Sequence, residues 1–278
     1  MRSTYAQNRS DIRRKRDNLA PHGTKQGTPE GIPCNFVCPR GEAEARKSHD
    51  SYPSVYVVEV PTATATNLKA VASTVSAPRI GTYLKAVSGD LPKAVALYGW
   101  NARVSSGLML PAHFAEVAAR NAVDEALTTV YGPLWPWDRT FEQSLPNPSN
   151  KQIYNPRRDL LAVRSRESTT GKVIAELKFV FWPGMFTARH DVRLWDGLIV
   201  SLFPGSPAPA RQTRRRIYDD LEAIRKLRNR LAHHEPIFTR NLADDLTRML
   251  DLVELRSAGT GAWVRAMEDA SLLLAQRP

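Results

Sequence analysis

The apolar residues of this chain recur at helical spacing from about residue 76 onward. Between Ser76 and Gly89, for example, Ile80, Leu84 and Val87 lie three or four positions apart. Similar spacing predicts further helices over 91–105, 111–130, 156–168, 192–203, 211–233, 242–255 and 262–274. Few segments alternate as β-strands do, and no internal repeat is visible. The pattern therefore predicts an all-α fold, a helical bundle.

Prolines set the expected boundaries of several of these helices. We expect Pro111 to begin a helix, because proline is tolerated in the first turn and disfavoured in a helix interior. The aromatic segment over 172–186 should be helical until Pro183 and Gly184 kink or break it.

The first part of the chain has a different character. Prolines and glycines interrupt residues 1–66 so often that no helical period survives. This pattern predicts a disordered or weakly structured N-terminal arm, followed by a helical domain over 67–278. Alternatively, translation starts downstream of Met1, so that part of this segment is not made.

Charge and composition narrow the class of partner. The formal net charge of +11 favours a polyanion, most simply RNA, although general surface basicity fits equally well. No run of eighteen apolar residues suggests a membrane span, and no apolar core follows the basic N-terminus as in a secretory signal. We therefore expect a cytoplasmic protein without a membrane contact.

Metal and cofactor chemistry has little support in the sequence. Cys34 and Cys38 have no matching second pair, so they do not complete a zinc site. No cluster of His, Cys and carboxylate residues has the spacing of metal ligands, and no Gly-rich loop could cradle a phosphate. We expect neither a metal nor another cofactor.

The most informative segment is the end of the basic helix over 211–233. Arg228, Asn229, His233 and His234 lie there, just before Pro236. An arginine can hold a phosphate and a histidine can move a proton near neutral pH, which together suit RNA cleavage. A structural interpretation also exists, because a histidine at a helix C-terminus is favoured by the helix dipole.

Helical geometry predicts how these side chains are placed. Arg228 falls about 40° from the buried stripe at Ile224, so its guanidinium needs an anionic partner, for which Glu116 is a candidate. His233 falls about 140° from Arg228. The two could meet if the helix tightens or ends near His233, because Pro236 prevents its continuation, or if a second subunit completes the site across a two-fold axis. The sequence leaves both alternatives open.

The segment over 227–238, Leu-Arg-Asn-Arg-Leu-Ala-His-His-Glu-Pro-Ile-Phe, resembles the signature of Abi-like (abortive infection) proteins. That family belongs to the wider HEPN group of bacterial helical nucleases. Two upstream segments agree in order and spacing: 116–122 is similar to the family's Glu-x3-Arg-Asn helix, and 176–182 to its aromatic helix. The resemblance covers roughly residues 76–275.

The resemblance implies a HEPN-like helical bundle with additional helices, acting as a metal-independent endoribonuclease in a toxin or phage-defence system. A homodimer is implied, with an antitoxin or regulatory RNA as a further partner. The catalytic residues carried over are Arg228, Asn229 and His233. The residues carried over as supporting the site are Glu116, Arg120, Asn121 and His234.

Further basic residues on and before the same helix are expected to follow the RNA backbone. They are Arg214, Arg215, Arg216, Arg225 and Arg230. For Arg214, Arg215 and Arg216, a solvated N-terminal turn of the helix fits equally well. The alternative function is a non-catalytic module of the same fold that binds RNA or a partner protein.

Overall fold

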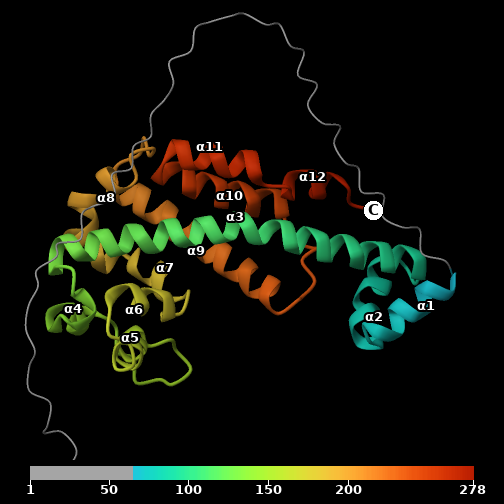
Figure 1. The fold of residues 1–278 in the computed structure, drawn as a ribbon, viewed down its shortest axis with the longest axis horizontal. Helices are drawn as coiled ribbons and strands as arrows, with labels where there is room; N and C mark the ends of the chain where they lie inside the picture. The colour runs from blue at the N-terminus through green and yellow to red at the C-terminus, as the bar shows by residue number, and fades with distance from the viewer. Residues whose placement is uncertain (1–64) are drawn as a thin grey trace, which may run out of the picture. The chain divides into compact units, whose positions relative to one another are not determined.

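The computed structural model describes residues 65–278, and within them it is entirely helical (Figure 1). Twelve α-helices and three short 3-10 or π segments occur in this part of the chain, without a β-strand. The all-α prediction is therefore confirmed. The arm predicted over 1–66 lies outside the described residues, apart from Ala65 and Thr66. These two begin α1 (Ala65–Thr74), a helix that the sequence pattern did not predict.

Helix α3 (Leu91–Tyr131) is the longest helix, and most other helices pack around it (Figure 1). We predicted two helices here, with a break before Pro111, and that prediction is wrong. Pro111 is buried inside one continuous helix, where it forfeits the hydrogen bond to the carbonyl of Gly107. Interior proline costs about 3 kcal/mol. Burial of the adjoining Leu108 and Ala112 against neighbouring helices offsets this cost.

Small side chains on α3 allow its neighbours to approach closely. Helices α9 (Ala210–Ala232) and α10 (Leu242–Arg256) both pack against it. The buried alanines on α3 are Ala94, Ala112, Ala115, Ala119, Ala122 and Ala126. Helix α12 (Ala270–Ala275) comes so near that a Cβ on Gly107 would lie 2.8 Å from a methyl carbon of Leu273.

The N-terminal half of α3 carries α2 (Ala77–Ala86), whose Tyr83 ring lies 5.1 Å from the rings of Tyr98 and Phe238. The segment after α3 contains a 3-10 turn and several short helices. They are η1 (Trp135–Trp137), α4 (Arg139–Ser144), α5 (Pro156–Arg164), α6 (Thr170–Glu176) and α7 (Phe181–Met185). Next come η2 (Ala188–His190), the π-helical η3 (Asp191–Trp195) and α8 (Asp196–Leu202).

The predicted break in the aromatic segment occurs earlier than expected. Helix α6 ends at Glu176, because Leu177 takes up an extended backbone conformation, and α7 starts at Phe181. Pro183 and Gly184 lie inside α7 rather than ending it. Pro183 is the third residue of that helix. The first four residues of a helix donate no intrahelical hydrogen bond, so the missing N–H of proline costs nothing there.

The C-terminal helices form as predicted except in one place. Helix α9 buries its predicted apolar stripe, and α10 follows the predicted range closely. The single helix predicted over 262–274 is instead two, α11 (Ala258–Met267) and α12, separated at Glu268 and Asp269. Within residues 65–278, no helix combines the length and the apolar character needed to cross a bilayer.

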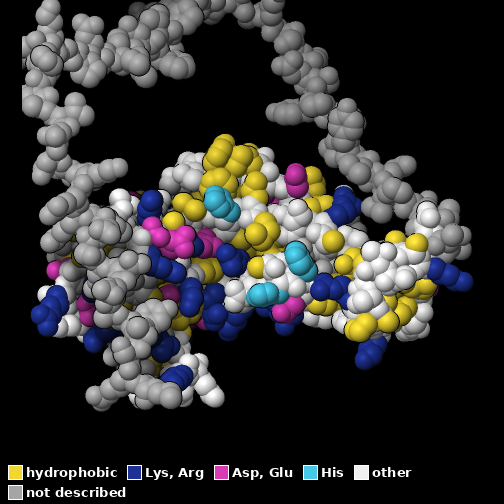
Figure 2. All heavy atoms as spheres, turned by 60° about the horizontal axis from the view of Figure 1, so that its bottom comes forward, with side chains coloured by type: hydrophobic (Ala, Val, Ile, Leu, Met, Phe, Trp, Pro, Cys, Tyr) yellow, Lys and Arg dark blue, Asp and Glu magenta, His cyan; other side chains and the backbone are white. Residues whose placement is uncertain are grey.

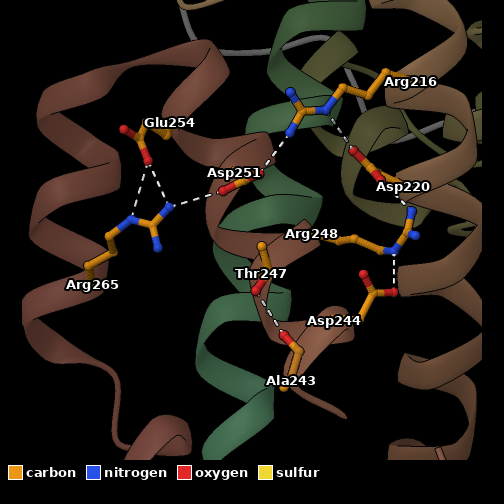
Figure 3. A network of polar contacts seen from close by, with 9 residues as sticks. All are labelled: Arg216, Asp220, Ala243, Asp244, Thr247, Arg248, Asp251, Glu254 and Arg265. Carbon is orange, nitrogen blue, oxygen red and sulfur yellow. Dashed lines mark hydrogen bonds and ion pairs between the residues drawn. The ribbon is translucent and has the colours of Figure 1, made fainter. Parts of the chain in front are cut away.

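A network of ion pairs joins α9, α10 and α11 (Figure 3). The guanidinium of Arg216 lies 3.5 Å from Asp220 and 2.8 Å from Asp251. Arg248 also contacts Asp220, at 2.7 Å, and Arg265 contacts Asp251, at 3.1 Å. Burial raises the pKa of Asp220, and the two guanidinium groups oppose that rise. The network therefore fixes the exposed edges of three helices whose other sides are apolar.

The close packing of α11 on α10 gives a test of this arrangement. A Cβ on Gly261 would lie 2.8 Å from the Cα of Glu254, whereas nothing lies within 4 Å of a Cβ on Gly259. We predict that Gly261→Ala lowers the free energy of unfolding by about 1–3 kcal/mol because backbone must move. Gly259→Ala, in the same helix, should leave it unchanged or raise it by up to about 1 kcal/mol. Urea unfolding measures both, and equal effects would contradict the packing.

Candidate functional site on the basic helix

The outward side of α9 borders a hollow of about 480 Å³. Arg225, Arg228 and Asn229 contribute to it from α9, and Arg120 from α3. The remaining wall is the stretch from the end of α6 to the start of α7, including Lys178. Figure 2 shows one face of the molecule where Lys and Arg side chains lie near exposed histidine side chains. The hollow is thus lined by several cations, a setting suited to an anionic ligand.

Arg228 has the anionic partner that the sequence predicted. Its Nε lies 3.8 Å from a carboxylate oxygen of Glu116, which also pairs with Arg120 one turn further along α3. The Glu116 side chain is 12% exposed and that of Arg228 is 40% exposed. The carboxylate is therefore held inside while the guanidinium remains open to solvent. The Arg120 guanidinium carbon also lies 5.6 Å from the centre of a Trp182 ring.

The end of α9 shows how Arg228 and His233 are placed within one chain. The His233 N–H still donates to the Asn229 carbonyl, at 3.0 Å, as in a regular α-helix. The helix is therefore regular up to His233 and ends there, as the first alternative allowed, but this ending does not bring the two side chains onto one side. His233 is exposed one turn beyond Asn229, on the same side of the helix, and about 140° from Arg228. Within one chain, Arg228 and His233 lie on different sides.

The chain leaves α9 through a left-handed turn at His234. This residue has a φ of 54°, a conformation that glycine adopts far more readily. The His234 N–H donates to Leu231, at 3.1 Å, and the Glu235 N–H donates to Arg230, at 2.8 Å. These two bonds form a Schellman C-cap, with the proline that often follows one at position 236. The sequence did not predict this cap, because a Schellman cap is usually recognised by a glycine and this position holds a histidine.

Two side chains from the N-terminal half of the domain fasten this turn. Arg79 donates from Nη1 to the His234 carbonyl, at 2.7 Å. The Oδ1 of Asn101, on α3, accepts the Ile237 N–H at 2.8 Å, in a buried position. The backbone that carries both histidines is therefore fixed by long-range contacts that no local sequence pattern indicates.

The structure brings together only part of the predicted supporting set. Glu116 and Arg120 lie beside Arg228, as expected. Asn121 is exposed and does not line the hollow, and His234 lines a separate one. Asn121 and His234 therefore belong to the sequence motifs but do not line the hollow beside Arg228.

The prediction that Arg214 binds RNA is wrong. Its side chain is buried, with Nε 2.7 Å from Asp191 and Nη1 donating to the Phe186 carbonyl at 2.8 Å. A guanidinium enclosed in this way holds η3 and the end of α7 against α9. It has no surface to offer to a phosphate.

The other four arginines reach the surface, but each has a carboxylate partner in the chain. Arg215 pairs with Asp219, Arg216 with Asp220 and Asp251, Arg225 with Glu222, and Arg230 with Glu235. Exposed pairs of this kind contribute about 0–1 kcal/mol, so a phosphate can compete for the guanidinium. The basic surface is therefore largely neutralised in the free protein, and it remains a prediction that these residues bind RNA.

A larger cavity, of about 910 Å³, adjoins the first and shares Val180 and Arg225 with it. Its lining includes Tyr218 and His190. Burial lowers the pKa of His190 to about 4, and the nearby Arg189 adds to the effect. His190 is therefore neutral at physiological pH, and no sequence signal distinguished it.

Among residues 65–278, no group of three or more His, Cys, Asp or Glu side chains is arranged to hold a metal ion. Cys34 and Cys38 lie outside the described residues. No protein-family model, curated protein or solved structure matches this chain significantly. The resemblance to Abi-like proteins thus rests on the motifs around Glu116, Glu176 and Arg228.

The contrast between two neighbouring arginines gives a direct test. Arg214→Ala leaves the buried Asp191 without its cation, and we predict a loss of about 3–5 kcal/mol in the free energy of unfolding. Arg215→Ala removes a guanidinium that is 69% exposed and should change it by less than about 0.5 kcal/mol. Chemical denaturation compares them. A similarly small effect of both substitutions would show that Arg214 is not a structural residue.

Proposed function

We propose that this protein is a metal-independent endoribonuclease of the HEPN type. The observation that carries the proposal is the state of Arg228, which is held by Glu116 yet 40% exposed at a cation-lined hollow. Asn229 lies beside it, and His233 is exposed one turn further on. An anchored, accessible guanidinium and an exposed imidazole are groups that phosphodiester chemistry uses.

Each residue has a defined task in this reaction. Arg228 binds the scissile phosphate and offsets the charge that develops on its oxygens. His233 takes the proton from the RNA 2′-OH or delivers one to the departing 5′-oxygen. Asn229, one turn from His233, orients the imidazole or the phosphate. Attack by the 2′-oxygen on phosphorus releases the 5′-oxygen and leaves a 2′,3′-cyclic phosphate. DNA, which lacks the 2′-OH, should resist cleavage.

In this proposal, a second copy of the chain completes the site. Arg228 and His233 are separated by about 140° around a helix that remains regular through this segment. A two-fold axis beside α9 would bring Arg228 of one protomer towards His233 of the other. The active form proposed here is therefore a homodimer with composite sites.

The wider biological role follows from the resemblance alone. Abi-like proteins suggest a cytoplasmic toxin or phage-defence effector, restrained by an antitoxin or a regulatory RNA. The net charge of +11 is compatible with RNA as substrate.

A second candidate function is a non-catalytic module that binds RNA or a partner protein. The observation that favours it is the separation of Arg228 from His233 within one chain, which leaves a monomer without a complete site. Such a module would retain RNA without cutting it. The two candidates therefore differ in product, not in binding.

Cleavage without metal tests the nuclease directly. We predict that purified wild-type protein cuts total RNA or tRNA in the presence of EDTA and leaves 2′,3′-cyclic phosphate ends. His233→Ala should reduce the rate by about a hundredfold or more, because the proton transfer is lost. His113→Ala, which changes an exposed histidine on α3, is the matched control and should cut like wild type.

Two results would contradict the nuclease. One is cleavage by His233→Ala at the wild-type rate. The other is RNA that shifts in a gel with wild-type protein but stays intact under all conditions. The latter result would support the binding module.

A further inference from the structure

A separate hollow of about 490 Å³ lies where α2, α3 and the end of α9 meet. Arg79 and Tyr83 border it from α2, Asn101 and Ser105 from α3, and His234 from the turn after α9. Its volume falls within the range of small-molecule pockets, which run from about 300 to 1,000 Å³. Among its lining residues, only His234 was predicted as a site residue from the sequence.

Two polar groups of this hollow have no hydrogen-bond partner in the described part of the chain, and neither atom is fully enclosed. The Asn101 side chain uses Oδ1 to accept the Ile237 N–H, which fixes the orientation of its amide. Its Nδ2 donors have no hydrogen-bond partner among residues 65–278, although Asn101 is only 5% exposed. The hydroxyl of Tyr83, which is 1% exposed, also lacks a partner within the described residues.

Because neither atom is fully enclosed, each remains open to a partner that enters the hollow. Both residues border the same open space, so the small accessible parts of their side chains face it. Burial raises the pKa of Tyr83 to about 12, so its hydroxyl is neutral and can donate. The hollow therefore presents two donors, from Tyr83 and Asn101, to a ligand that brings acceptors.

The remaining walls indicate a planar ligand. The Tyr83 and Tyr98 rings meet edge to face with centres 5.1 Å apart, and Met109 adds an apolar surface. The guanidinium of Arg79 already donates to the His234 carbonyl. Aromatic and thioether walls with two hydrogen-bond donors suit a heteroaromatic ring with carbonyl groups better than a bare phosphate.

The position of His234 links the hollow to the proposed reaction. Its Cα is about 3.8 Å from that of His233, so the hollow begins beside the proposed proton donor or acceptor. His234 also keeps its side chain at a backbone position that glycine would occupy with less strain. An observed outlier of this kind suggests that the side chain is retained for a purpose.

We propose that this hollow receives the base of a nucleotide next to the cleaved phosphate, and that it selects a base with carbonyl acceptors, uracil over adenine. The inference rests on the proposed function in taking RNA as the substrate. Tyr83 and Asn101 are then specificity-determining residues, each donating one hydrogen bond to the base. They take no part in moving protons at the cleavage site.

Binding of uncleavable RNA separates this inference from the nuclease activity. Fluorescence anisotropy with short 2′-O-methyl oligouridylate and oligoadenylate gives the ratio of their affinities for the full-length protein. The 2′-O-methyl group removes the nucleophile, so cleavage does not interfere. We expect wild-type protein to prefer oligouridylate.

Two variants test the donors individually. Tyr83→Phe removes only the hydroxyl, and Asn101→Asp keeps the acceptor for Ile237 while replacing Nδ2 with an oxygen. Each should lower the preference for oligouridylate about tenfold. Thr129→Asp adds the same charge to an exposed part of α3 away from the hollow and should leave the preference unchanged.

The possible outcomes distinguish the two proposals. Wild-type binding without a base preference, or a preference that survives both variants, would overturn the base pocket even if the protein cuts RNA. No binding of either oligonucleotide would also overturn it. A preference that both variants reduce, in a protein that never cuts RNA, would support the pocket and refute the nuclease.

Discussion

The uninterrupted course of α3 through Pro111 is the constraint on which the rest of this domain depends. Asn101, before the proline, fastens the turn after α9, whereas Glu116, after it, holds Arg228. A helix broken at Pro111 would leave these two anchors free to move independently. An interior proline destabilises a helix by about 3 kcal/mol, but the continuous α3 holds its two contacts with α9 and the following turn at a fixed spacing. Buried alanines on α3 allow its neighbours to pack closely, and Gly107 gives α12 room to do so.

The end of α9 shows how stability and function are joined. The left-handed position of a Schellman cap is normally occupied by glycine, which adopts it without strain, but here it is occupied by His234. Contacts from Arg79 and Asn101 hold this strained turn from two different helices. The consequence is a rigid presentation of His233 to solvent and of His234 to a hollow. The two adjacent histidines therefore have different surroundings and, in our proposals, different tasks.

The sequence predicted the features that depend on helical periodicity and on the need of a partly buried guanidinium for an anionic partner. The apolar stripe of α9 and the pairing of Arg228 with Glu116 both follow from helical geometry and from the cost of an unpaired guanidinium. The continuity of α3 could not be predicted, because tertiary burial outweighs the local preference of Pro111. Burial of Arg214 was also hidden, since its partner Asp191 is distant in sequence. The hollow at Asn101 and Tyr83 depends on three segments that only the fold brings together.

The separation of Arg228 and His233 around α9 means that a single chain does not complete the proposed site. A mixing experiment tests this most directly: Arg228→Ala and His233→Ala proteins, each inactive alone, are combined after subunit exchange and assayed on RNA. Half of randomly paired dimers are mixed, and each has one intact site of two, so roughly a quarter of wild-type activity should return. No recovery, with exchange verified, would contradict a composite site formed by two copies of α9.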